Sequence, residues 1–539
     1  MMKNMEAQGV KQVKKPSHRV GPSSILQPLN PRTNRWQFPP RRAILLLSLV
    51  LTFLMASCRS KLPTSTPSLV PPPQSSLSTN SPIPPTVQPS PPNETAIAQE
   101  TDQALPGPPS PPTQYTLRAQ LDYDAHHLTV QEGILYANHT GEELSDLSLV
   151  VEPNRYPGGF LLTDISWDDG SGIKDYALEG PQLNLPLRQP LGTGERVGFS
   201  ISYELNLPQQ GAPFGYTERQ TNLADWYPFL PAYIPGKGWS IHEAAYLGEH
   251  LTYDIADYLV DIHLTNPTSA AGLPLTIAAS AISLEQDDWT HYHLENARNF
   301  AWSVSDQYQV ISMSAGSISI QGYSFPYHPT ADEPAVKTAA QALNLFSQLF
   351  TPYQHNSLSV VEADFLNGME YDGMFFLSHA FYDYFTGTSE NNLIIISAHE
   401  TAHQWFFGQV GNDQAMEPWL DEALATYCES LFYEHIYPDK LDWWWQNRVY
   451  FHNPEGWVDS TIYNTPGFYP YRDAIYLRGA LFMNDLRDLM GDEDFFAFLR
   501  DYLHQFRFRQ ASGDDFFSLL SKHTSADLSG LLSTYFANR

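Results

Sequence analysis

The distribution of proline sets the first limit on how this chain can fold. Sixteen of its 43 prolines lie within residues 59–113, mixed with Ser and Thr, as in "PPPQSSLSTNSPIPPTVQPSPP". A segment of this composition cannot bury enough apolar surface to fold and favours extended polyproline II. Residues 58–113 are therefore predicted to be a tether, with a low-complexity interaction arm as the weaker alternative.

The chain before the tether has the features of an export signal. Two arginines precede a largely apolar run, residues 43–57, that ends at Cys58. A helix of this length spans about 22 Å at 1.5 Å per residue, which is shorter than a hydrocarbon core of about 30 Å. A basic flank, a short apolar core and small residues at its end predict a secretory leader and signal over residues 1–57.

The end of this run, "MASC", resembles a bacterial lipobox, with Met55 where Leu is usual. The resemblance implies that Cys58 becomes the lipidated first residue after cleavage, and an uncleaved signal anchor is the alternative. In both cases the folded part is expected to be extracytoplasmic and held on the outer face of the membrane.

Charge and cysteine content exclude two classes of protein. Beyond residue 61 the chain holds 19 Lys and Arg against 58 Asp and Glu. Nucleic-acid binding depends on basic side chains that neutralise phosphates, so a nucleic-acid partner is not expected. The chain has two cysteines, Cys58 and Cys428. A disulfide framework is therefore excluded, and Cys428 is predicted to be a small buried apolar residue.

Hydrophobic periodicity divides the rest of the chain into two folded parts. Residues 114–325 show short alternating stretches between turn signals, such as "LSLVVEP" and "VGFSISYEL", and predict an all-β domain. Residues 326–539 predict an α+β domain, in which Pro334 opens a helix and the strands "SLSVVEADF" and "MFFLS" follow. Further helices are expected over about 389–407, 418–435 and 472–490, and a last helical pair over 492–536.

The α+β part contains a pattern typical of a metal site. His399 and His403 are spaced i, i+4, which puts both imidazoles on one face of a helix, and Glu400 stands beside the first. Zinc accepts neutral imidazole nitrogens, and a catalytic zinc has three protein ligands and an open position. So short a pattern also recurs by chance on ordinary helix surfaces.

A second acidic helix strengthens the metal hypothesis. Eighteen residues separate His403 from Glu422, and a turn at "GQVGNDQAM" allows the second helix to return and present Glu422 to the same metal. Glu429 lies two helical turns further on the same face. It is predicted to accept a proton from the far nitrogen of one ligand histidine, with a solvated helix acid as the alternative.

Here the chain resembles the aminopeptidase N family of zinc metallopeptidases, which are gluzincins with a thermolysin-like catalytic domain. The resemblance rests on "HETAHQWFFGQVGNDQ…EPWLDEALATYCE", which departs from the family pattern at Asp421 and Ala423, and covers about residues 114–539. It implies one Zn²⁺ per chain held by His399, His403 and Glu422. It also implies that Glu400 takes the proton of a zinc-bound water and that the β part is the family's N-terminal saddle domain.

Two further family positions can be placed by resemblance. The segment "NGMEY" is similar to the family's G-x-M-E-N strand, which implies that Gly368, Met369 and Glu370 bind substrate and that Glu370 meets its free α-amine. The alternative for Glu370 is an acid in an exposed turn. The segment "IYLRGALF" implies that Tyr476 stabilises the tetrahedral intermediate, with Arg478 in place of the family's lysine. The alternative for Tyr476 is a core aromatic residue.

Taken together, the sequence predicts a zinc aminopeptidase that removes N-terminal residues from peptides outside the cell. Its partners would be peptides with a free N-terminus and a membrane, reached through a lipid anchor or a signal anchor. A zinc endopeptidase and a catalytically inactive peptide-binding scaffold remain as alternatives. Larger relatives add a domain that closes over the site, and this chain ends at Arg539, so an open cleft is expected unless a partner supplies a lid.

Overall fold

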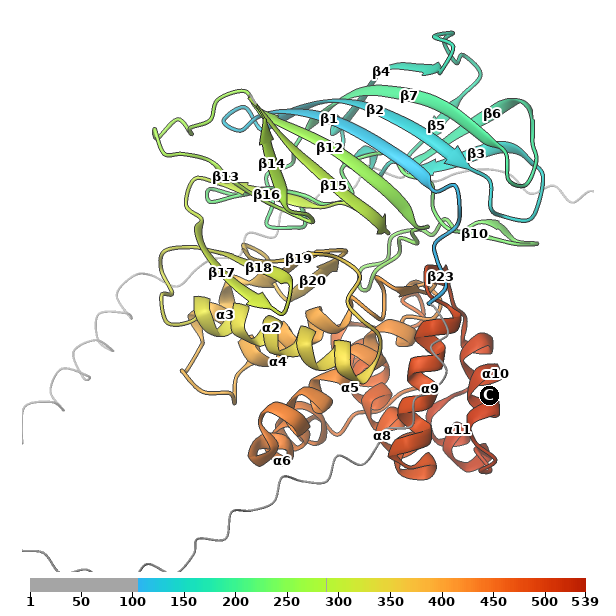
Figure 1. The fold of residues 1–539 in the computed structure, drawn as a ribbon, viewed down its shortest axis with the longest axis vertical. Coiled ribbons are helices and arrows are strands. Elements are labelled where there is room, and N and C mark those ends of the chain that lie inside the picture. Colours follow the sequence, from blue (N-terminus) through green and yellow to red (C-terminus); the bar gives the residue numbers. More distant parts are fainter. Residues whose placement is uncertain (1–104, 287) are drawn as a thin grey trace, which may run out of the picture. The chain divides into compact units, whose positions relative to one another are not determined.

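The computed structural model describes residues 105–286 and 288–539 (Figure 1). The predicted leader, Cys58 and the tether as far as residue 104 lie outside the described residues. Within the described part, none of the helices combines the length and apolar character needed to cross a membrane.

The N-terminal part is built from β-sheets. Its largest sheet has seven strands in the order β14-β15-β12-β1-β2-β7-β4. Side chains along β1 alternate between buried and exposed, so one face of this sheet packs on the core and the other meets solvent. Bounds of these strands are Thr113–Asp122 (β1), His127–Ala137 (β2), Phe160–Trp167 (β4), Arg196–Asn206 (β7), Ala256–Leu264 (β12), Ser283–Gln286 (β14) and Trp289–Ala297 (β15).

Three smaller sheets complete the described β part. One has the order β3-β6-β5, another has the order β13-β16-β9-β8, and the third pairs β10 (Tyr233–Ile234) with β11 (Gly238–Trp239). Their bounds are Leu144–Val150 (β3), Ala177–Glu179 (β5), Gln182–Leu191 (β6), Phe214–Tyr216 (β8), Thr221–Leu223 (β9), Thr276–Ala279 (β13) and Trp302–Ser305 (β16). Side chains from these sheets and from the large sheet share one buried apolar core.

The second part has a five-stranded sheet in the order β17-β18-β19-β21-β20. Strands β18, β19 and β21 pair in parallel, and β17 and β20 pair antiparallel at the two edges. The strands β17 and β18 lie within the predicted 114–325 segment but pair with β19, so the sheet of the second part begins before residue 326. The bounds are Gln309–Ala315 (β17), Ile318–Ser324 (β18), Ser357–Ala363 (β19), Gly368–Tyr371 (β20) and Met374–Ser378 (β21).

Helices cover this sheet on the side away from the β part (Figure 1). Helix α2 packs against β17, β18 and α4, and helix α5 packs between α4 and α8. Almost every residue of α5 is buried, Cys428 included, as a central helix requires. The bounds are Asp332–Leu349 (α2), Asn392–Ala402 (α4), Trp419–Ile436 (α5), Arg478–Met490 (α8), Asp492–Gln505 (α9), Gly513–His523 (α10) and Ser529–Tyr535 (α11).

These results confirm the predicted fold class, α+β after a β-rich N-terminal part, and correct details of three helices. The expected helix 389–407 ends at Ala402, with His403 as its C-cap. The stretch 472–490 begins as a π-helical segment, η5 (Arg472–Leu477), before α8. The last pair is three helices, because the chain breaks between α9 and α10 and again before α11.

A buried arginine joins the two parts close to the predicted metal site. Arg298, at the end of β15, is 2% exposed. Its guanidinium donates to the backbone carbonyls of Phe407, Gly408 and Arg509. The β part therefore holds the loop that follows His403.

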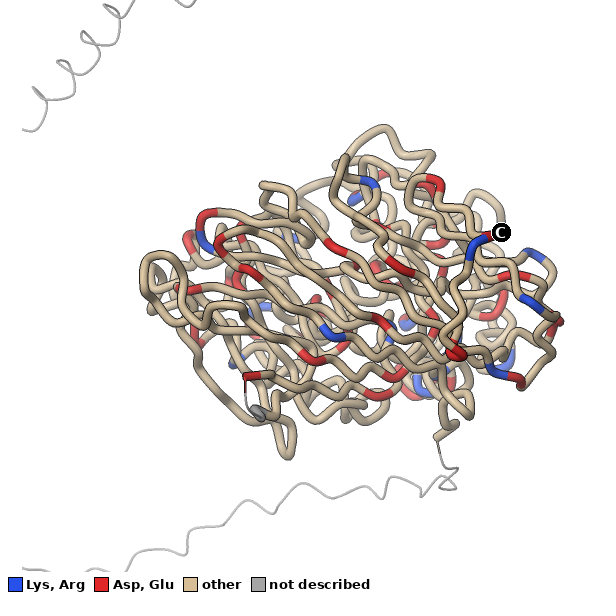
Figure 2. The backbone as a smooth tube through the Cα atoms, turned by 90° about the horizontal axis from the view of Figure 1, so that it is seen from above, with Lys and Arg blue, Asp and Glu red and all other residues tan. Residues whose placement is uncertain are grey.

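The described part of the chain carries many more acidic than basic side chains. Figure 2 shows Asp and Glu residues distributed along many segments, with Lys and Arg between them, rather than gathered in one patch.

Candidate active site

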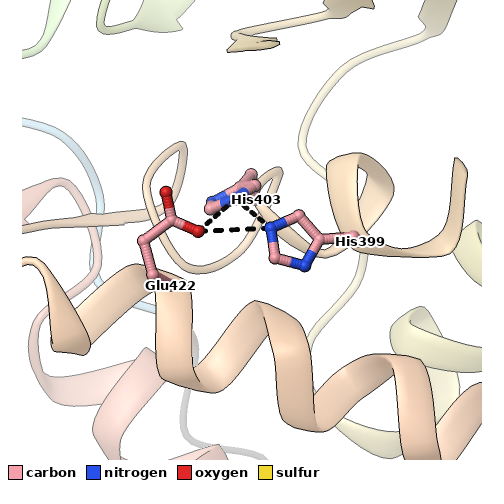
Figure 3. A group of neighbouring side chains, drawn as sticks. All are labelled: His399, His403 and Glu422. Atoms are coloured by element: carbon pink, nitrogen blue, oxygen red, sulfur yellow. Dashed lines mark hydrogen bonds and ion pairs between the residues drawn. The ribbon is translucent and has the colours of Figure 1, made fainter. Parts of the chain in front are cut away.

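The two histidines come from the last turn of helix α4. The Asn391 side chain caps the start of this helix by accepting from the Leu393 N–H. The i, i+4 spacing then places His399 and His403 one turn apart on a face that is 4% and 1% exposed. Helix α5 runs past this face and presents Glu422, from its first turn, to both imidazoles (Figure 3).

The three side chains form a triangle whose size fits a zinc ion. The His399 Nε2 atom lies 3.2 Å from Glu422 Oε2 and 3.2 Å from His403 Nε2, and His403 Nε2 lies 3.6 Å from Glu422 Oε2. Tetrahedral ligands at about 2.0 to 2.1 Å from zinc are separated by about 3.3 Å. The donor set of two imidazoles and one carboxylate is also one that zinc takes in catalytic sites.

Hydrogen bonds on the far side of each ring turn both Nε2 lone pairs toward this centre. His403 Nδ1 lies 3.0 Å from the carbonyl oxygen of Phe406, which only accepts, so Nδ1 carries the proton. His399 Nδ1 lies 2.9 Å from a carboxylate oxygen of Glu429, which is the contact expected from the sequence. Two lone pairs facing one another at 3.2 Å repel unless a cation lies between them. The arrangement fits a metal ion.

Glu429 is itself held by three side chains. In addition to His399, Trp444 Nε1 donates to it at 3.1 Å, and Arg448 donates through Nε and Nη2, both at 2.8 Å. Burial alone would raise the pKa of Glu429, but Arg448 and His399 lower it below its usual value. Trp444 ends helix α6 (Leu441–Trp444), and Arg448 lies in the π-helical segment η3 (Trp445–Val449) that follows.

Burial and the neighbouring charges act in opposite directions on the ionisable groups of the triangle. Burial lowers the pKa of His399, but hydrogen bonds to Glu422 and Glu429 outweigh it and raise this pKa to about 9. Burial likewise raises the pKa of Glu422, but hydrogen bonds from His399 and His403 outweigh it and bring the pKa below its usual value.

Glu400 lies beside the triangle with one free carboxylate oxygen. It is 4% exposed, and its Oε2 atom has no hydrogen-bond partner within the described residues. Burial raises the pKa of Glu400 to about 8, against the lowering effect of His399 and His403. Gly368 permits its close approach to strand β20, since a Cβ at position 368 would come within 1.9 Å of Glu400 Oε1.

Glu370 reaches the same centre from β20, the edge strand of the five-stranded sheet. Carboxylate oxygens of Glu370 and Glu400 and a ring nitrogen of His403 all lie within 4.8 Å of one another. This group could hold a cation as well, but it contains one imidazole where the group at Glu422 has two. Gln414 Nε2 donates to Glu370 at 3.1 Å and to Asp421 at 3.0 Å.

Tyr476 is placed over His399 by the π-helical segment η5. The two rings stack with centroids 5.9 Å apart and an angle of 12° between their planes. Burial and the nearby Glu422 raise the pKa of Tyr476 well above its usual value, so its hydroxyl stays protonated. Arg478 lies away from the site, where it donates to the Thr534 carbonyl and stacks on Tyr535.

All eight residues that the sequence predicted for the site line one cleft of about 340 Å³. The cleft has two walls. One wall comes from the second part of the chain. The other comes from the β part and consists of Pro213, Tyr246, Leu247, Gly248 and Glu249. Gly248 has φ +75°, and a Cβ there would lie 2.5 Å from Ile462 and 2.7 Å from the Tyr471 hydroxyl.

Several residues that support the site could hardly be found from the sequence. Gln414 lies in the turn between the two helices, Arg448 in an irregular helix, and Glu249 in a loop of the β part. Tertiary contacts bring each of them to the centre. A Gly-Glu pair in a turn and an arginine on a helix are too common to indicate a site.

The fold and the triangle of two imidazoles and one carboxylate define a class of protein that can hold a zinc ion, with both histidines presented by one helix. Comparison with known proteins shows what this chain resembles. Residues 335–535 match the Peptidase family M1 domain. The chain is 27% identical over 236 residues to human endoplasmic reticulum aminopeptidase 2, covering 41% of this chain and 25% of that protein. It is 24% identical over 287 residues to aminopeptidase N of Lactobacillus delbrueckii subsp. lactis, covering 48% of this chain and 34% of that protein.

Solved structures show the same fold over more of the chain. An M1 zinc metallopeptidase from Deinococcus radiodurans aligns with a TM-score of 0.57 and 18% identity, covering 79% of this chain and 94% of that structure. The resemblance found in the sequence is therefore confirmed: residues 335–535 match the peptidase family M1 domain, aminopeptidase N is among the curated relatives, and the solved structures with this fold are M1 zinc metallopeptidases. The matched regions are a quarter to a third of the length of the two curated relatives.

Proposed function

We propose that this protein is a zinc aminopeptidase that removes the first residue of peptides. The observation that carries the proposal is the position of Glu370. Its carboxylate lies within 4.8 Å of ligand atoms of both Glu400 and His403. A carboxylate so close to the reacting centre favours a free α-ammonium there, through a charge-assisted hydrogen bond. A substrate whose α-ammonium is held at Glu370 would have only its first residue upstream of the bond that is cut.

The proposed chemistry assigns one task to each side chain. His399, His403 and Glu422 would hold one zinc ion per chain. When bound, zinc polarises a carbonyl oxygen and lowers the pKa of a water from 15.7 to about 7. Glu400 has an unpartnered oxygen, Oε2, with which to accept the proton of the attacking water. The hydroxyl of Tyr476 stays protonated and can donate to the oxygen that becomes negative.

The edge strand β20 offers a way to align the substrate. An edge strand has unpaired backbone groups, and an extended peptide can pair with them as an added strand. Glu370 lies on this strand, and Gln414 holds its carboxylate in place. A mutant of the Deinococcus radiodurans enzyme has been solved with a Tyr-Ser-Ala substrate bound. Its similarity to this chain supports a short peptide as the substrate here.

Localisation belongs to the same proposal. The predicted signal over residues 1–57, the lipidation of Cys58 and the tether would together hold the enzyme outside the cell on the membrane surface. Replacing Cys58 with Ala should release the protein from membranes or leave it unprocessed. Unchanged membrane fractionation of this variant, together with a wild type that itself keeps the unprocessed mass, would favour the signal anchor instead.

The proposal is tested with aminoacyl-arylamides whose α-amine is free or acetylated, assayed on purified residues 99–539 with the zinc content measured in parallel. Free substrates should be hydrolysed and acetylated ones scarcely at all. Equal hydrolysis of both forms would favour the endopeptidase alternative. Full zinc with no hydrolysis of either form would favour the inactive scaffold.

A further inference from the structure

A second cavity lies beyond Glu370, on the side of the β part. It has a volume of about 250 Å³. It adjoins the active-site cleft, because the same five residues line both spaces: Pro213, Gly248, Glu249, Met369 and Glu370. A substrate whose α-ammonium lies at Glu370 therefore has a neighbouring space that its first side chain can enter.

The lining of this cavity combines carboxylates with aromatic rings. Beyond Glu370, acidic side chains come from Glu152, Asp225 and Glu249, and the rings come from Tyr156, Phe214 and Tyr253. Aromatic faces attract cations as well as apolar groups. The composition alone therefore does not separate an apolar ligand from a cationic one.

The ion pairs that the carboxylates form, or lack, distinguish a cationic ligand from an apolar one. Glu152 is neutralised, since it pairs with Arg155 at 2.7 Å and with His250 at 3.5 Å. Asp225 and Glu249 form no ion pair with any described residue. Asp225 accepts a hydrogen bond from the Tyr253 hydroxyl at 2.6 Å. Two acidic groups in the cavity wall are thus left without a positive partner.

A buried side-chain amide makes one wall of this cavity polar. Asn299 lines the cavity and is 2% exposed, and its Nδ2 atom has no hydrogen-bond partner in the described structure. Buried polar atoms are usually paired with protein, water or a ligand. Because Nδ2 is a donor, this wall suits a water molecule that can accept from it, and it penalises an apolar group.

We propose that the cavity binds the first side chain of the substrate and that Asp225 and Glu249 select arginine or lysine there. The inference rests on the proposed aminopeptidase function, because Glu370 must first hold the α-ammonium. A long basic side chain extends past Glu370 and brings its positive group to the two unpaired carboxylates. Its aliphatic stem packs against the rings of the wall.

The protonation of Asp225 supports this assignment. Burial raises the pKa of Asp225 to about 7, with the Tyr253 hydrogen bond opposing it. A carboxyl group in this state is half ionised near neutral pH. A cationic side chain stabilises its charged form, so binding gains an attraction that an uncharged ligand of the same shape lacks.

The test compares substrates of equal shape and different charge. Arginine and citrulline have nearly the same shape, and so do lysine and norleucine, but one member of each pair carries no positive charge. Wild-type kcat/KM should favour the charged member by about 10- to 100-fold, the effect of a charge-assisted hydrogen bond. Asp225→Asn and Glu249→Gln should each bring this ratio down toward one.

The matched control is Glu243→Gln. Glu243 belongs to the same loop as Glu249, but its side chain is 92% exposed and does not line the cavity. This variant loses one negative charge near the site and should keep the arginine-to-citrulline ratio. A ratio that falls equally in Glu243→Gln and Asp225→Asn would overturn the proposal, because the preference would then come from general electrostatics.

Two outcomes separate this proposal from the one on which it rests. Hydrolysis of free substrates with no preference for arginine over citrulline overturns the cavity assignment and leaves the aminopeptidase standing. Equal hydrolysis of free and acetylated substrates overturns the aminopeptidase itself. Calorimetric binding of argininamide and citrullinamide gives a second readout that does not need turnover, and equal affinities would also overturn the cavity assignment.

Discussion

The two folded regions contribute to one cleft in different ways. The second region supplies the proposed metal ligands from two buried helices, α4 and α5, whose positions are fixed by packing on all sides. The β region supplies loop residues such as Gly248 and Glu249 and one end of a side cavity. We therefore expect the chemistry to depend on helix spacing and the choice of substrate to depend on loops. Variants in the two regions should affect different kinetic parameters.

The largest effect should follow removal of a metal ligand in the helical region. His403→Ala should lose zinc and lower kcat/KM by more than about 10³-fold, since the metal contributes several kcal/mol to the reaction barrier. Elemental analysis and kinetics measure both. His293→Ala in the β region, whose side chain is 49% exposed, is the control and should keep its zinc. Full zinc in His403→Ala would remove this residue from the ligand set.

The next effect should come from the tyrosine stacked on His399. Tyr476→Phe removes one donor to the developing oxyanion and should lower kcat by about 10²–10³-fold while KM changes little. The control is Tyr469→Phe, in the neighbouring helix and 68% exposed, which should behave as wild type. If kcat of Tyr476→Phe equals that of wild type, the hydroxyl does not reach the reaction centre.

A smaller effect is expected where the helical region supports a ligand indirectly. Arg448→Met leaves the buried carboxylate of Glu429 without its two strongest donors, so His399 is oriented less firmly. Zinc affinity should fall by about 10–100-fold, as measured by competition with a chelator. Arg118→Met, at a side chain that is 49% exposed in the β region, should leave it unchanged. Equal affinities in both variants would show that Arg448 does not help to orient His399.

The smallest effect should come from the β-region wall. Gly248→Ala forces a Cβ toward Ile462 and Tyr471, so the loop must move and KM should rise a few-fold while zinc content stays normal. Gly236→Ala is the control, because Gly236 has the same φ of +75° with nothing within 4 Å. Both should lose about 1 kcal/mol of stability from the left-handed backbone. Equal KM values in the two variants would separate this loop from substrate binding.

The sequence predicted which side chains meet at the candidate metal site better than it predicted their surroundings, for a physical reason. His399, Glu400 and His403 lie within one helical turn, so their spacing alone determines which face they share. Glu422 required one further step, the return of the second helix. The π-helical segments that place Arg448 and Tyr476 change the helical period, and a regular period cannot reveal them.

The sequence predicted that the first region consists of strands, but it did not predict which of its residues reach the site. Alternation identifies a strand without identifying its neighbour, which is why β17 and β18 were expected in the first part of the chain. Asp225 and Glu249 reach the site from loops, where no periodicity indicates direction. Their side chains approach Glu370 through tertiary packing alone.

The central claim is that Glu370 limits the enzyme to the first residue of a peptide. The most direct measurement is the ratio of kcat/KM for free and N-acetylated aminoacyl-arylamides, in wild type and in Glu370→Gln, with zinc content determined in both. The wild type should strongly favour the free amine, and Glu370→Gln should lose most of that preference while keeping one zinc per chain. An unchanged ratio in Glu370→Gln at full zinc content would contradict the account.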